Sequence, residues 1–184
     1  MATNNGVNLQ DINDYVEAVK DDKNKAQVQF VAQSKWAGGT ASKITCTEFL
    51  VDGQPGSDAK RHFSFDMDEP AALGGNDSAP NPVEYLAAAL CGCLTAGIAT
   101  NSALFGNELE KIDIEVKVDF DMQGVLGIDR SVPSSAAKLH YKVKLKGADK
   151  AGTLRSKETI DRKSAIKNTL QLPLEITTEV EIED

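Results

Sequence analysis

Two stretches of the chain show the most regular alternation of apolar and polar positions. In residues 112–122 every second residue is apolar, and most residues between them are acidic. Residues 139–145 repeat the pattern, with lysines and one histidine in the polar positions. A period of two places the apolar side chains on one face of a strand. Both stretches are therefore predicted to be long antiparallel strands, and pairing them would set opposite charges across the ladder.

A different pattern fills residues 81–104, where no charged side chain follows Glu84 and apolar residues occur on every side of the helical wheel. The stretch begins with Asn81, Pro82 and Glu84, which fit the N-cap, the first helical position and the third position of a capping box. A helix that faces water carries a polar stripe. We therefore expect a long central helix that is buried on all sides, and we assign Glu84 to capping.

Shorter patterns indicate the remaining elements. Helical spacing predicts a short helix between residues 9 and 25 and a helical region over residues 150–170. Further strands are predicted at residues 28–32, 44–50, 63–67 and 174–182, and a loop rich in glycine, proline and asparagine at residues 68–80. This order predicts an α+β fold with one domain, residues 26–184, preceded by an N-terminal extension at residues 1–25.

Composition narrows the class of protein. The 184 residues are 41% hydrophobic and 26% charged, and the net charge is −8, which is typical of an ordinary soluble domain. The negative charge argues against nucleic acid or an anionic membrane as a partner, because both favour a basic surface. No secretory leader begins the chain, and the central helix is rich in alanine and glycine, so we expect a cytoplasmic protein. Three cysteines without metal-type spacing indicate reduced thiols and no metal site.

The cysteines are the candidates for chemistry. Cys91 and Cys93 are two positions apart, about 200° around a helix, so their side chains diverge and cannot form a disulfide. Cys93 lies well inside the helix among apolar neighbours, which disfavour a thiolate, so its activation would require a cation from elsewhere in the fold. Cys91 is assigned to packing. Cys46, on a predicted strand, is a candidate to resolve an oxidised Cys93.

The order of elements and the motif NPVEYLAAALCGCL resemble the OsmC/Ohr family. Members of that family are described as thiol-dependent hydroperoxide reductases that form intertwined homodimers. The resemblance extends from about Ala26 onward and places the reactive cysteine at Cys93. It implies an OsmC-like α+β fold, a homodimer, and a small apolar cavity around Cys93 near the dimer interface.

Three other positions of the family's active site are replaced in this sequence. The resemblance aligns the arginine after a Gly-Gly turn with Thr40, the glutamate near the start of the central helix with Val83, and the resolving cysteine with Ser164. A cation that activates Cys93 must therefore be another one. The candidates are Arg61, Lys43 and Arg130.

These residues lead to two hypotheses from different classes. In the first, Cys93 reduces small hydrophobic hydroperoxides and is recycled by an external thiol, because Ser164 cannot resolve the sulfenic acid. In the second, the chain is a non-catalytic dimer that binds a small apolar ligand, its peroxidase site being degenerate. Thiol chemistry on another electrophile stays open as a third. We expect no cofactor, and we assign His62 and His140 to the surface.

Overall fold

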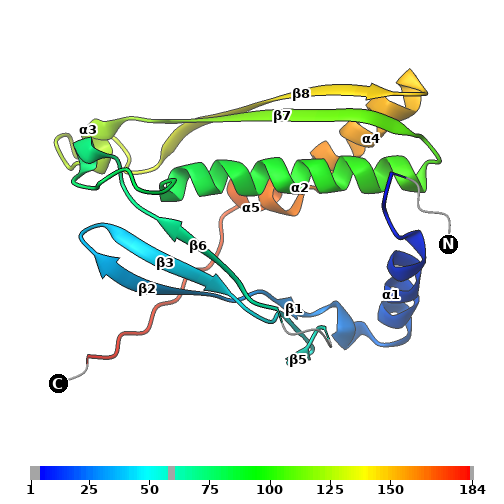
Figure 1. Cartoon of the computed structure of the whole chain (residues 1–184), viewed down its shortest axis with the longest axis horizontal. Coiled ribbons are helices and arrows are strands. Elements are labelled where there is room, and N and C mark those ends of the chain that lie inside the picture. Colours follow the sequence, from blue (N-terminus) through cyan, green and yellow to red (C-terminus); the bar gives the residue numbers. More distant parts are fainter. Residues whose placement is uncertain (1–4, 58–60, 183–184) are drawn as a thin grey trace.

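The apolar stretch after Asn81 forms the long helix α2 (Pro82–Leu104), around which the other elements are arranged (Figure 1). The computed structural model describes residues 5–57 and 61–182. The capping box is confirmed, because the Asn81 side chain accepts from the Glu84 amide and the Glu84 carboxylate accepts from the Asn81 amide. Glu84 is therefore a capping residue, as predicted.

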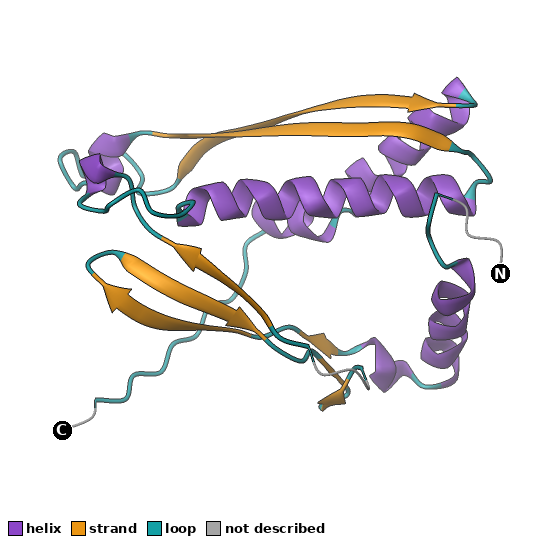
Figure 2. Ribbon diagram, viewed as in Figure 1, coloured by secondary structure: helices purple, strands orange, loops and turns teal. Residues whose placement is uncertain are grey.

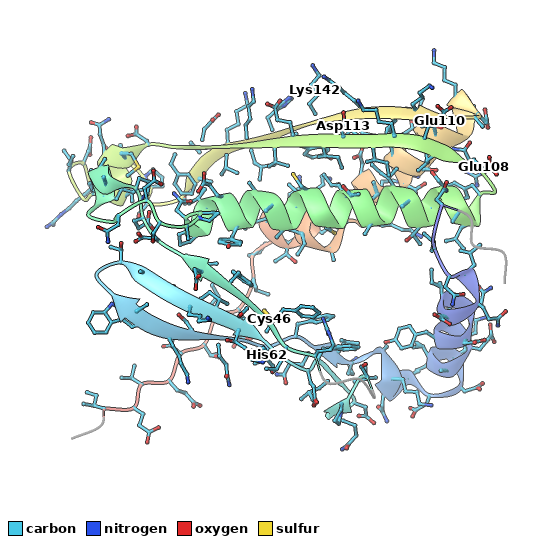
Figure 3. All side chains as sticks on the ribbon, viewed as in Figure 1. Cys46, His62, Glu108, Glu110, Asp113 and Lys142 are labelled. Atoms are coloured by element: carbon cyan, nitrogen blue, oxygen red, sulfur yellow. The ribbon has the colours of Figure 1, made fainter. Side chains whose placement is uncertain are left out.

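An antiparallel ladder of two strands, β7 (Leu109–Phe120) and β8 (Ala136–Gly147), covers one side of α2 (Figure 2). Apolar residues of both strands face α2, whereas Asp113 and Lys142 point away from it (Figure 3). The register places Asp113 opposite Lys144, and Glu115 opposite Lys142. The predicted alternation and the opposite charges across the ladder are both confirmed. The connection between the strands begins with the short helix α3 (Met122–Val125).

The predicted helical region at residues 150–170 is confirmed, but it is divided into α4 (Lys150–Lys163) and α5 (Ala165–Gln171). Ser164 separates the two helices because its backbone is extended, with a ψ of 115°. It caps both of them: its amide donates to the Ile160 carbonyl at the end of α4, and its hydroxyl oxygen accepts from the Lys167 amide in α5. These two hydrogen bonds stabilise the break.

A seam of small and hydroxyl-bearing side chains holds α4 antiparallel to α2. The contacts along the seam pair Asn107 with Thr153, Ser102 with Ser156, Gly97 with Ile160, and Cys93 with Ser164. Gly97 permits this close approach, because a Cβ atom there would lie 2.1 Å from the Cδ1 atom of Ile160. The seam fixes the position of α4 and thereby brings Ser164 to Cys93.

The core lies between α2, the ladder and α4. Its most buried members are Leu90, Leu94 and Ile98 from α2 and Ile160 from α4. Inward-facing residues of β7 and β8 pack against them. Fully burying one such aliphatic side chain contributes about 1.5–3 kcal/mol. This packing favours a core helix, although α2 is by length and composition apolar enough to cross a membrane.

A second antiparallel sheet lies across α2 from the ladder (Figure 1). Its strands, in spatial order, are β2 (Ala32–Gly38), β3 (Ala41–Cys46) and β6 (Phe63–Met67), and a smaller sheet joins β1 (Val28–Gln29), β4 (Leu50–Val51) and β5 (Gln54–Pro55). The predicted strands at 28–32 and 44–50 are thus each divided between two sheets. Tyr85 connects the larger sheet to α2, because its hydroxyl donates to the Asp66 carbonyl at 2.9 Å and its ring packs against Phe65.

The N-terminal segment is attached near the C-terminal end of α2. The predicted helix is confirmed as α1 (Leu9–Asp21) and is followed by a 3₁₀ turn (Lys23–Ala26). Asn5 connects the segment before α1 to the turn between α2 and β7. Its side-chain NH₂ group donates to the Asn107 carbonyl, and its side-chain oxygen accepts from the Leu109 backbone amide. Residues 1–4 of the predicted extension lie outside the described residues.

Two predictions from the sequence are wrong for this structure of one chain: the burial of α2 on all sides and the strand at residues 174–182. One face of α2 is exposed, so the helix is not buried on all sides; that bare face consists of Ala88, Ala89, Gly92, Thr95 and Ala96. The predicted strand at residues 174–182 is not formed, and this tail extends away from the other elements (Figure 1). Its side chains Leu174, Ile176, Val180 and Ile182 are 68–89% exposed. A strand needs a neighbouring edge for its hydrogen bonds, and within the described residues no strand pairs with this tail.

Candidate functional site

Cys93 and Ser164 form the closest side-chain contact at the predicted site. Cys93 lies in the middle of α2 and is half-buried, and its Sγ atom is 3.3 Å from the Oγ atom of Ser164. Ser164 is fully buried. The structure thus brings together the residue predicted to react and the residue that stands in the family's resolving position.

The hydrogen bonds of Ser164 determine what this contact can do. Its Oγ atom accepts from the Lys167 amide at 3.2 Å, which leaves the hydroxyl proton for a second partner. The sulfur of Cys93 is within hydrogen-bond distance of that hydroxyl. A thiolate has no proton to give, so in that state Ser164 must be the donor, and a donor to the charged form stabilises it. Ser164 has no sulfur and cannot form a disulfide, but its hydroxyl is placed to donate a hydrogen bond to the Cys93 sulfur.

Two further site candidates are Cys46, which ends β3, and Arg61, which lies just before β6. Cys46 is on β3 and, like His62, lies across the molecule from the β7–β8 ladder (Figure 3). The Arg61 guanidinium stacks over the rings of Phe49 and Phe63, at 5.0 and 5.4 Å from their centroids. The Arg61 guanidinium is therefore engaged by two aromatic rings. Within the described residues, neither Arg61 nor Cys46 forms a hydrogen bond with Cys93.

The other two cations considered form no hydrogen bond with the thiol in the described part of the chain. Lys43 is exposed on β3, and Arg130 is exposed in the connection between β7 and β8. Across residues 5–57 and 61–182, Ser164 is the one hydrogen-bond partner of the Cys93 side chain. Within a single chain, the contribution of these residues to the activation of Cys93 stays a prediction.

Cys91 has the packing position that the helical geometry predicts. Its Sγ atom lies 3.8 Å from the Ile114 carbonyl oxygen of β7, whereas Cys93 contacts Ser164, the N-cap of α5. The two thiols therefore diverge, and all three cysteines of the chain are free.

Thr40 has a structural role at the position of the family's arginine. Its hydroxyl donates to the Asp68 carboxylate at 2.6 Å, and the Ser78 hydroxyl and the amides of Glu69, Asn76 and Ser78 donate to the same group. Asp68 is almost completely buried. The hydrogen bond from Thr40, with those from Ser78 and Asn76, holds the pKa of Asp68 well below its usual range despite the opposing effect of burial. Asp68 thereby organises the loop at residues 68–80, a role that the sequence analysis missed.

Val83 and the two histidines are the remaining positions that the sequence analysis considered. Val83 is a half-buried apolar residue in the first turn of α2, so it cannot act as the carboxylate that the resemblance aligns with this position. His62 and His140 are exposed, as predicted.

A cavity of about 260 Å³ lies between α2, β8 and α5, beside the site but not at the thiol. The residues that line it are Leu90, Leu139, Tyr141, Lys167, Leu170 and Gln171. Leu90 precedes Cys93 by about one helical turn. The predicted cavity around Cys93 is therefore displaced along α2. At one wall, burial together with the hydrogen bond to Asp161 and its charge raises the pKa of Tyr141 to about 12, so this hydroxyl keeps its proton at neutral pH.

A family model described as "OsmC-like protein" matches residues 74–179, which is more than half of the chain. The matched segment contains α2 with Cys93, the β7–β8 ladder, and α4 and α5 with Ser164 between them. The chain therefore belongs to the OsmC-like protein family. No curated protein matches the sequence significantly.

Solved structures share the fold. The chain resembles a candidate osmotic stress induced and detoxification response protein from Psychrobacter arcticus 273-4, with TM-score 0.55 and 12% identity over 75% of this chain and 85% of that one. An OsmC like protein from Mycoplasma pneumoniae gives 0.53 and 12%, over 79% and 87%. An organic hydroperoxide resistance protein OsmC from Legionella pneumophila gives 0.51 and 18%, over 78% and 89%. Similarity at these identities establishes the fold and leaves the activity to be argued from the site.

Proposed function

We propose that this chain is a cytoplasmic protein that reduces organic hydroperoxides through Cys93. The observation that supports the proposal most is the 3.3 Å contact between the Cys93 sulfur and the buried Ser164 hydroxyl, within an OsmC-like fold. The thiolate is the nucleophilic form of a cysteine, and the Ser164 hydroxyl is placed to donate to it.

The reaction has two stages. In the first, the Cys93 thiolate attacks the terminal oxygen of the hydroperoxide, the one that carries the hydrogen; the O–O bond breaks, and the alkoxide leaves and takes a proton from solvent. The products are an alcohol and a sulfenic acid on Cys93. In the second, an external thiol attacks the sulfenic sulfur and water leaves, and a second external thiol attacks the mixed disulfide and releases the Cys93 thiolate. Both reducing thiols come from outside because Ser164 carries no sulfur.

A second candidate function is non-catalytic binding of a small apolar ligand. Two observations favour it: within the described chain no cation bonds to Cys93, and an apolar cavity lies beside it. The two functions differ in the reactivity of the thiol. A catalytic Cys93 reacts rapidly with an alkylating agent at neutral pH, whereas a purely structural Cys93 reacts no faster than a free cysteine.

We further propose that the functional unit is a homodimer. The face of α2 that contains Gly92 is bare, and two aromatic side chains, Phe30 between β1 and β2 and Trp36 on β2, are 75% and 79% exposed. Exposed apolar surface of this extent is typical of an interface. The unpaired tail at residues 174–182 keeps the alternating pattern of a strand and is suited to pair with a sheet edge of a second copy. That copy is then a further source of a cation for Cys93.

Turnover of cumene hydroperoxide with dithiothreitol as the reductant tests the activity. Wild type is compared with Cys93→Ser, and Cys91→Ser serves as the matched control from the same helix. We expect activity in wild type and in Cys91→Ser and none in Cys93→Ser. Equal rates for wild type and Cys93→Ser would remove the peroxidase proposal and leave the binding protein.

The mass in solution, measured by light scattering after size exclusion, tests the dimer. Gly92→Leu places a large side chain on the bare face of α2, and we expect it to shift the protein toward the monomer. Glu158→Leu, at an exposed position on α4, adds a similar apolar group elsewhere and should leave the mass unchanged. A wild-type monomer at micromolar concentration would contradict the proposal.

A further inference from the structure

The cavity between α2, β8 and α5 combines an apolar floor with polar groups near its mouth. Leu90 forms the floor and is completely buried, and Leu139 from β8 lies beside it in the lining. Leu170, which is 42% exposed, and the exposed Gln171 mark the side that opens to solvent. An apolar pocket with few polar groups is the usual form of a small-molecule site.

Lys167 supplies a charge to this cavity that no acidic side chain neutralises. Its Nζ atom donates to the main-chain carbonyl of Asp161 at 2.7 Å. The carboxylate of Asp161 is already engaged, by Lys157 at 2.5 Å and by the Tyr141 hydroxyl at 2.9 Å. Among the described residues, none places a carboxylate in ion-pair contact with Lys167. A half-buried ammonium group beside an apolar pocket is complementary to an anion on an apolar tail.

We propose that this cavity binds a medium-chain monocarboxylate, with its carboxylate on Lys167 and its alkyl chain toward Leu90. The size fits, because a cavity of about 150 Å³ is enough for benzene and this one is about 260 Å³, which suits a chain of about eight carbons. The amide of Gln171 is available as a second donor at the mouth. The site does not require the thiol, because Cys93 does not line the cavity, so it stands independently of the peroxidase proposal.

Calorimetric titration with octanoate and with octan-1-ol tests the site. The two probes share the alkyl chain and differ in charge, so the alcohol reports on the cavity and the acid on Lys167. We expect wild type to bind octanoate more tightly than octanol. Lys167→Met should weaken octanoate by roughly tenfold and change octanol little. Lys163→Met removes the same charge from an exposed position on α4 and should behave as wild type.

Two further variants separate the alternatives. Leu170→Trp fills the mouth at a partly exposed position and should weaken both probes. Cys93→Ser should bind octanoate as wild type does. If wild type binds octanoate but does not turn over the hydroperoxide, only the peroxidase proposal is refuted. Octanoate that does not bind wild type, or that binds Lys167→Met equally well, would overturn the inference.

Discussion

The Cys93 sulfur lies 3.3 Å from the Ser164 hydroxyl oxygen, although 71 positions separate the two residues in the sequence. The seam between α2 and α4 sets this distance, and the extended backbone of Ser164 places the hydroxyl at the joint of two helices. The pair places the residue proposed to react beside the residue that the resemblance aligns with a resolving cysteine. Its chemistry can therefore be changed by single substitutions.

A cysteine in place of Ser164 should form a disulfide with Cys93. In Ser164→Cys we expect a bond to Cys93 under mild oxidation, because a small rotation of the two side chains suffices to bring sulfurs at this spacing to the roughly 2.05 Å of a disulfide. Mass analysis of thiol-blocked peptides measures it. Ser156→Cys, in the same seam but opposite Ser102, should stay reduced. A Ser164→Cys protein that keeps all its thiols free after oxidation would show that the observed spacing is wrong.

Removing the hydroxyl should make Cys93 less reactive. A hydrogen bond to a charged group contributes about 1.5–3 kcal/mol, so Ser164→Ala should slow alkylation of Cys93 at neutral pH by roughly tenfold or more. Ser156→Ala removes a buried hydroxyl that does not contact the sulfur and is the matched control. Rates followed by peptide mass analysis measure the effect. Unchanged alkylation in Ser164→Ala would mean that Ser164 does not stabilise the thiolate.

The close contact of α2 and α4 should be sensitive to one methyl group. Gly97→Ala would place a Cβ atom 2.1 Å from the Ile160 Cδ1 atom, and we expect overpacking to lower the free energy of unfolding by about 1–3 kcal/mol. Denaturant unfolding measures the loss. In the double variant with Ile160→Val the Cδ1 atom is absent, so part of the stability should return relative to the sum of the single changes. Additive losses would contradict the contact.

The buried Asp68 carboxylate should make stability depend on acid pH. Because the folded pKa is lowered, Asp68 contributes stability above the ordinary value near 4 and loses it as the pH falls below that value toward the folded pKa. Asp68→Asn should lower the melting temperature at pH 7 and flatten its decline below about pH 4. Asp119→Asn, at an exposed position on β7, is the control. An equally steep decline in Asp68→Asn and wild type would assign the acid sensitivity to other groups.

The sequence predicted those elements whose own residues determine their structure. The alternation over residues 112–122 predicted most of strand β7 (Leu109–Phe120), although Met122 begins α3. The Asn81–Glu84 capping box correctly predicted the start of α2. The break at Ser164 carries no glycine or proline signal, and it depends on hydrogen bonds to both helices. It was therefore not predictable from local pattern.

The features that were missed depend on distant partners. The exposed face of α2 and the unpaired tail at residues 174–182 reflect surfaces that one chain does not cover, whereas apolar pattern alone suggests burial. Asp68 and Lys167 are polar residues in a loop and a helix, and their sequence neighbours do not indicate what they contact. The role proposed for Cys93 came from the resemblance to the family motif, and its contact with Ser164 required the fold.

Trapping of a sulfenic acid tests the central proposal most directly. The protein is treated with one equivalent of cumene hydroperoxide in the presence of dimedone, and the adduct is located by peptide mass analysis. The proposed chemistry predicts an adduct on Cys93, none on Cys46 or Cys91, and slower formation in Ser164→Ala. An unlabelled Cys93, with the hydroperoxide still intact, would contradict it.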